Sequence, residues 1–145
     1  MLIRRQFRRD ENRRGAVLVE MALVLPIFLA VVLGIIEFGR AMMVSQMITN
    51  AAREGTRMGI IDDETNSSVE TWIKDFLSDA AGVNPNDVTV TITVDNPAAG
   101  NEVGNAEARD LITIVISVPF NKVQYVSGNF LNGKNLTARS AMRHE

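Results

Sequence analysis

An apolar run of 21 residues, 16–36, contains a single charged side chain, that of Glu20. At about 1.5 Å per residue, a helix of this length measures roughly 31 Å, which is enough to cross the hydrocarbon core of a bilayer. A cleaved secretory signal would have a shorter apolar region that ends in a small-x-small site. No such site follows Ile36, so the sequence predicts a transmembrane helix over residues 16–37.

Charged side chains are distributed unevenly around this run. Six arginines precede Gly15 against two acidic residues, whereas the chain from Ala16 onward holds nine basic and fifteen acidic side chains. Basic residues beside a membrane helix stay in the cytoplasm, so we expect residues 1–15 to form a cytoplasmic leader and the C-terminal part to lie outside the cytoplasm. An arginine-rich arm can also bind nucleic acid. Its position directly before the run favours an orientation signal, with membrane lipid and not nucleic acid as the partner.

A helical pattern continues beyond the membrane segment, over residues 38–60. The expected buried stripe is Val44, Ile48, Ala51, Gly55 and Met58, and the expected wet stripe is Gln46, Asn50, Arg53 and Arg57. We therefore expect an extracytoplasmic continuation of the same long helix.

Two features of this helix suggest specific roles. Pro26 lacks an N–H donor and clashes with the preceding turn, so it should bend the transmembrane part. The small residues Ala51, Gly55 and Gly59 stand four apart and form a close-packing stripe. Such a stripe admits another backbone, either a neighbouring helix or, as we favour, a sheet laid across the helix.

Residues 61–145 read as a small globular body. Ser67 and Glu70 have the spacing of a capping box, which predicts a second helix that ends at Gly82. Its apolar face includes Trp72 and Phe76, both expected in the core.

Alternating β-branched and apolar residues predict the strands of this body. "VTVTITV" (88–94) has one apolar face, while "LITIVISV" (111–118) has two, which suggests a central strand. A weaker third strand covers residues 136–143. The fold class is therefore α+β, with a long N-terminal transmembrane helix packed against a small antiparallel β-sheet and one extra helix.

The residues that usually carry out catalysis are scarce in this chain. It has no cysteine, and its one histidine, His144, is next to the last residue, where we expect a frayed tail. The acidic turn at Asp62, Asp63 and Glu64 lacks the spacing of a calcium-binding loop. We expect no enzymatic activity, no cofactor and no metal site.

The segment that precedes Glu20 has a recognisable form. A basic leader ends in Gly15, and Glu20 is the fifth residue after it. This arrangement resembles the processing site of type IV prepilins. The wider stretch 13–59, with "ALVLP", "GIIEFGR" and "NAAREGTR", resembles the TadE-like family of minor pilins and pseudopilins of tight-adherence (Flp) pilus systems, as does the closing "LTARSAMRHE". One departure is Met21, where this pilin branch often has an aromatic residue.

The resemblance implies a type IV pilin-like fold, a place in the bacterial inner membrane or in a pilus, and a set of partners. A prepilin peptidase would cut between Gly15 and Ala16, giving Ala16 a free α-amino group that is a cation near neutral pH. Glu20 of one subunit would then pair with Ala16 of another during assembly with other pilins, pseudopilins and the secretion machinery. The alternative is an unprocessed single-pass anchor that displays an extracytoplasmic binding module, with Glu20 reaching the cytoplasmic headgroups.

Overall fold

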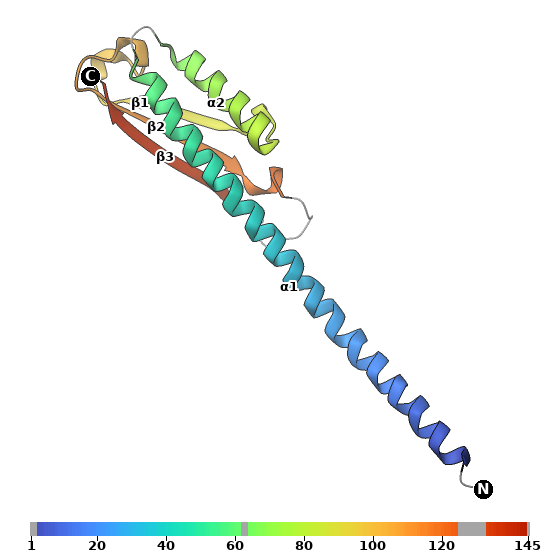
Figure 1. Cartoon of the computed structure of the whole chain (residues 1–145). Helices are drawn as coiled ribbons and strands as arrows, with labels where there is room; N and C mark the ends of the chain where they lie inside the picture. Colours follow the sequence, from blue (N-terminus) through green and yellow to red (C-terminus); the bar gives the residue numbers. More distant parts are fainter. Residues whose placement is uncertain (1–2, 62–63, 125–132, 145) are drawn as a thin grey trace. The chain divides into compact units, whose positions relative to one another are not determined.

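The computed structural model describes residues 3–61, 64–124 and 133–144, with side chains from Gly15 onward (Figure 1). The chain divides into two compact units, residues 1–36 and residues 37–145, called unit 1 and unit 2 below. Unit 1 is helical, whereas unit 2 contains both helix and sheet. Helix α1, Ile3–Gly59, contributes residues to both units.

Unit 2 joins the second part of α1 to one further helix and one sheet. Short 3-10 turns connect these elements, and the main elements after α1 are α2 (Asn66–Ala81), β1 (Thr89–Val94), β2 (Leu111–Pro119) and β3 (Asn135–Arg143). The strand order is β1-β2-β3, and both pairings are antiparallel. The predicted α+β class and the central position of the second strand are therefore confirmed.

The core of unit 2 lies between the helices and one face of the sheet. From α1, the side chains of Val44, Ile48 and Ala51 are fully buried, as the helical spacing predicted, and the whole predicted wet stripe is exposed. The inward face of β2 consists of Ile112, Ile114, Ile116 and Val118, all with no exposed surface. These residues form one hydrophobic cluster with those of α2, so α1 and α2 share a single core with the sheet.

Helix α2 is capped at both ends, and one predicted cap is wrong. Gly82 ends the helix in a left-handed conformation (φ 64°), as expected of a C-terminal glycine. The N-cap, however, is Thr65, whose hydroxyl accepts a hydrogen bond from the Ser68 N–H at 3.2 Å, while the Ser68 hydroxyl accepts one from the Thr65 N–H. Ser67 therefore lies inside the helix. Serine at the third helical position does here what the glutamate of the usual motif does.

The apolar face of α2 was predicted correctly in its main residues. Val69, Ile73 and Leu77 are fully buried. Trp72 and Phe76 stack on each other with ring centroids 5.3 Å apart, but both are partly exposed and pack at the margin of the core. Their rings are therefore less central than the sequence suggested.

The connection between β1 and β2 is held to the start of α2 by hydrogen bonds. Asn66 is central to this contact: its N–H donates to Glu102 Oε1 at 2.7 Å, its Nδ2 donates to the Asn101 carbonyl at 2.6 Å, and its Oδ1 accepts from the Val103 N–H at 3.1 Å. The Glu102 carboxylate thus satisfies a free amide at a helix N-terminus, where a negative charge is favourable. This network keeps the Val103 side chain in the core.

The C-terminal end of the chain extends the sheet. The His144 N–H donates to the Asp110 carbonyl at 2.9 Å, and the His144 carbonyl accepts from the Arg109 N–H at 2.8 Å. The prediction of a frayed tail is therefore wrong at His144. Nearby, the Asp110 carboxylate accepts hydrogen bonds from the Glu107 N–H and from Asn96 Nδ2, and the first of these bonds is the main cause that lowers the pKa of Asp110.

Gly55 and Gly59 lie where α1 approaches the rest of unit 2. A Cβ atom at Gly55 would stand 2.7 Å from Cδ1 of Ile73 in α2 and 3.5 Å from Cδ1 of Ile114 in β2. A Cβ atom at Gly59 would meet side chains of Val103 and Ile112 at 3.5 and 3.7 Å, which is ordinary van der Waals distance. The small residues of the stripe thus admit both a helix and a sheet, and the tightest approach is to the helix.

We predict that Gly55→Ala destabilises unit 2 while Gly59→Ala is close to neutral. The buried Ile73 side chain must move to admit the new methyl group at position 55, which typically costs about 1–3 kcal/mol and outweighs the gain of up to about 1 kcal/mol from replacing a helix glycine by alanine. Alanine at position 59 fits, and there the gain is small because Gly59 is the last residue of the helix. Thermal unfolding of the full chain in detergent measures both variants beside wild type. Equal melting temperatures for the two variants would show that the approach at Gly55 is not tight.

Candidate functional site

Residues 16–36 of unit 1 present an apolar helix surface. Its large side chains are about half exposed or more at most positions, with Leu18 at 71 %, Leu23 at 69 % and Ile27 at 69 %. Water does not favour a surface of this extent, so it marks contact with lipid or with other proteins. Helix α1 is long and apolar enough to cross a membrane once, judged by its length and composition.

Glu20 lies on this apolar helix and is exposed. Among the described residues it has neither a hydrogen-bond nor an ion-pair partner. Ala16 is four residues earlier, so the two positions lie about one turn apart on the same side of the helix. Within a bilayer or a bundle, a carboxylate in this position needs a proton or a cation from outside the described residues.

Gly15, the predicted cleavage position, lies within α1 and is exposed. A Cβ atom there would meet nothing within 4 Å, so no packing explains the glycine. Glycine in a helix interior costs about 1 kcal/mol relative to alanine, which weakens the helix locally. The arginine side chains of the predicted leader lie outside the described residues.

Helix α1 continues through Pro26. Because proline has no N–H, the Ala22 carbonyl lacks its usual donor at this turn. The predicted bend stays a prediction, and its physical basis is this missing hydrogen bond.

At the start of unit 2, the burial of Glu37 and the hydrogen bonds of Arg40 are features that the sequence did not reveal. Glu37 is buried, with 2 % of its surface exposed. One turn later, Arg40 donates through Nε to the Val123 carbonyl at 3.1 Å and through its second terminal nitrogen to the Ala81 carbonyl at 2.5 Å. Ala81 is the last residue of α2, so Arg40 joins α1 to the C-terminal carbonyl of α2 and to the turn after β2.

The signal that could have identified these residues is their position. Both belong to "GIIEFGR" and stand three residues apart at the end of the apolar run, and charged side chains beside apolar ones are rarely buried unless they are paired. The sequence does not show which carbonyls Arg40 would reach, because Ala81 and Val123 are distant from it along the chain.

We predict that Arg40→Lys lowers the free energy of unfolding of unit 2 by about 1–3 kcal/mol. A lysine ammonium keeps the charge but lacks the planar fork that reaches two carbonyls at once, and a hydrogen bond to a charged group contributes about that much. Chemical denaturation of the full chain in detergent measures the loss. Arg53→Lys, on the exposed stripe of α1, is the matched control and should stay within about 0.5 kcal/mol of wild type. A stable Arg40→Lys variant would contradict the bridging role.

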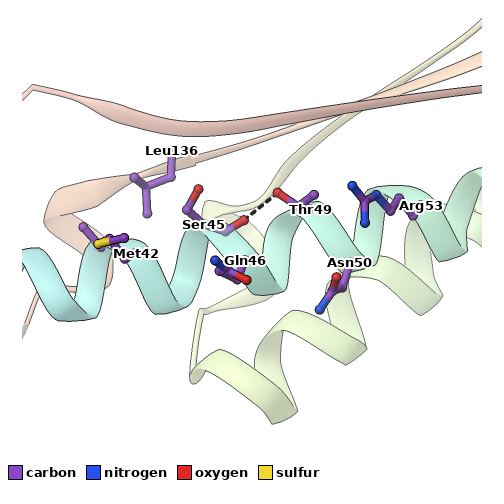
Figure 2. A pocket seen from close by; sticks show the side chains of 8 residues that line it. Met42, Ser45, Gln46, Thr49, Asn50, Arg53 and Leu136 are labelled. Carbon is purple, nitrogen blue, oxygen red and sulfur yellow. Dashed lines mark hydrogen bonds between the residues drawn. The ribbon is translucent and has the colours of Figure 1, made fainter.

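A groove of about 510 Å³ runs along the exposed side of α1 in unit 2 (Figure 2). Most of the α1 residues along it are polar, and Leu136 of β3 closes it; the lining residues are Ala41, Met42, Ser45, Gln46, Thr49, Asn50, Arg53 and Leu136. The Thr49 hydroxyl donates to the Ser45 carbonyl at 2.8 Å, so its donor hydrogen is used while its oxygen can still accept a hydrogen bond. Arg53 supplies the one formal charge of this lining.

Beyond the groove, Glu54 and Arg57 form an ion pair at 2.5 Å on the exposed side of α1. The hydrogen bond from Arg57 lowers the pKa of Glu54, and the same bond raises the pKa of Arg57. Both groups are exposed, so the pair contributes little to stability. Among the described residues, no group of three or more His, Cys, Asp or Glu side chains could hold a metal ion.

Residues 15–57 match the family model described as TadE-like protein. The match confirms the resemblance over these residues, which begin at Gly15 and include Glu20, Glu37 and Arg40. No curated protein and no solved structure matches the chain. The TadE-like segment therefore coincides with the apolar helix of unit 1 and with most of the α1 part of unit 2.

Proposed function

We propose that this protein is a TadE-like minor pilin or pseudopilin that acts in the assembly of a tight-adherence pilus. The observation that carries the proposal is that the TadE-like match begins at Gly15 and continues along an apolar helix able to cross a membrane. The role is structural: the protein assembles with other subunits and carries out no catalysis.

The proposed membrane is the bacterial inner membrane, with the N-terminus in the cytoplasm and unit 2 outside it. The six arginines before Gly15 support this orientation, because basic flanks remain on the cytoplasmic side. The chain has no cysteine, so introduced thiols report position cleanly. A cysteine at the exposed Ala98 should react with an impermeant reagent added outside the membrane, whereas one at Arg5 should not. The reverse labelling would overturn the orientation.

Cleavage between Gly15 and Ala16 would give Glu20 a partner. The new α-amino group carries a positive charge near neutral pH. Two opposite charges inside a bilayer or helix bundle are costly to separate once paired, since removing one leaves the other buried and uncompensated. Glu20 of one subunit paired with Ala16 of another therefore favours assembled subunits over separated ones. Prepilin peptidase, other pilins and pseudopilins, and the secretion machinery are the partners in this proposal.

Glu20→Gln tests the proposal directly. Glutamine keeps the size of the side chain and removes its charge, and a more apolar helix should still insert in the membrane. In cells with an active prepilin peptidase, we expect the variant to be cut after Gly15. Crosslinking and pull-down with the variant should recover at least fivefold less pilus protein than with wild type. A fivefold loss corresponds to about 1 kcal/mol of lost pairing free energy. Intact mass of the membrane-derived protein establishes the N-terminus in the same samples.

Gly15→Leu is the matched variant for processing. The larger side chain should block cleavage, so this variant should retain residues 1–15 while its unit 2 stays folded. If a fully processed Glu20→Gln protein recovered as many pilus components as wild type, the proposed assembly role of Glu20 would be contradicted. Retention of Met1 in the wild-type protein would likewise favour the unprocessed anchor with a binding module.

A further inference from the structure

The two edges of the sheet in unit 2 have hydrogen-bonding groups that point outward. In an antiparallel ladder, alternate residues bond to the neighbouring strand and the others face away. The Asp95 N–H donates to the Leu111 carbonyl, whereas the Val94 N–H donates to Asn101 Oδ1 off the sheet. By this alternation, the backbone groups of Val90 and Ile92 point away from β2, and within the described part of the chain they bond to nothing.

The same argument applies to the opposite edge. The Phe120 N–H donates to the Lys134 carbonyl, and the His144 N–H donates to the Asp110 carbonyl, so the even-numbered residues of β3 face β2. The backbone groups of Thr137, Arg139 and Ala141 therefore point outward. They too have no backbone partner among the described residues.

The two edges differ in charge. The six residues of β1 carry no charged side chain and no proline, which are the usual protections of an exposed edge, and Asp87 and Asp95 flank the strand. The exposed side chains of β3 include Arg139 and Arg143. The β1 edge is therefore uncharged and flanked by two acidic residues, whereas the β3 edge is basic.

We propose that a second copy of this chain adds its β1 edge to the β3 edge of the first, so that the sheet continues from one subunit to the next. Both strands are antiparallel to β2 and so run in the same direction, which makes the junction parallel. The inference rests on the sheet edges of unit 2 and does not depend on the proposed function or on cleavage at Gly15.

The alternation of the strands agrees with this junction. In a parallel pair, a residue with both backbone groups facing its neighbour bonds to the two residues that flank its opposite. Ile92 would lie opposite Ser140 of the second copy and bond to Arg139 and Ala141, which are the residues whose groups point outward. Ile92 and Ser140 both have side chains on the face that carries the helices, since each is level with Ile114, that is, directly opposite it on the neighbouring strand. The joined sheets therefore keep their helices on one side.

The register that keeps all strands level also pairs opposite charges. Within one sheet, Thr89 is level with Ser117 and Ser117 with Thr137, so a level neighbour would place Thr89 beside Thr137. Counting along both strands, this register places Asp95 beside Arg143. A shift by two residues would lose this pairing, so charge favours the level register.

The groove along α1 would receive part of the neighbour's helix layer. Helix α2 contacts β1, so it would accompany β1 to the β3 edge, next to the groove that Leu136 closes. The exposed side chains of α2 include Asp75 and Asp79, and the groove contains Arg53. Because the two contacting surfaces differ, repetition of this contact yields a row or ring of several subunits and not a two-fold dimer.

A disulfide tests the register. Thr89 and Thr137 are exposed and lie two strand spacings apart within one chain, about 9–10 Å, which is too far for a disulfide. We expect the double variant Thr89→Cys, Thr137→Cys, made as the full chain in cell membranes and oxidised, to give a ladder of disulfide-linked multimers on a non-reducing gel. The matched control, Thr93→Cys with Thr137→Cys, is offset by four residues and should give none.

Three further arms decide the outcome. Each single cysteine should leave the protein monomeric, and co-expression of the two single variants should give dimers. Adding Ala141→Pro to the double variant should reduce the ladder roughly five- to tenfold, because proline removes one outward N–H and leaves the bonds to β2 in place. Dimers from Thr89→Cys alone would indicate a two-fold contact through β1 and overturn the proposal. Absence of any ladder in a protease-resistant, membrane-inserted double variant would overturn it as well.

Discussion

The structure depends on the division of one helix between two environments. Residues 16–36 of α1 are apolar on all sides apart from Glu20 and expose most of their side chains, while residues 41–59 bury one stripe against α2 and the sheet. Without that stripe, the inward face of β2 would lose a large part of its cover, since three strands and a 16-residue helix make a small core on their own. The helix that inserts in the membrane therefore also completes the core of unit 2.

Contacts at the two ends of α2 fix it against the other elements. Arg40 of α1 binds the last carbonyl of α2, and Asn66 joins the first turn of α2 to the connection after β1. The Ala81 carbonyl and the Asn66 N–H, which donates to Glu102, are backbone groups that helix ends leave without partners inside the helix. Gly55 allows the middle of the two helices to come close. These three contacts are all between residues distant in the chain, which explains how a chain without disulfides can hold a small sheet and two helices in one core.

Much of the fold could be predicted because its signals are periodic. The stripe from Val44 to Ala51 and the alternation in β2 each depend on side chains at regular spacing, and the structure buries those side chains. The N-cap of α2 was misplaced because Thr65, Ser67 and Ser68 are all plausible caps, and the choice between them depends on the tertiary contact at Asn66. For the same reason, the hydrogen bonds of Arg40 could not be derived from its position in the sequence. The predicted roles of Gly15, Ala16 and Glu20 concern partners outside the chain.

The boundary at residues 36 and 37 has a consequence for how the protein unfolds. Lipid stabilises a helix by excluding water from its backbone, whereas the packed core stabilises α1 in unit 2 through burial of side chains. Denaturants act strongly on the second kind of stability and weakly on the first. Unfolding in a bilayer should then proceed in at least two transitions, with residual helix after the sheet has melted. A single free energy of unfolding describes unit 2 and not the whole chain.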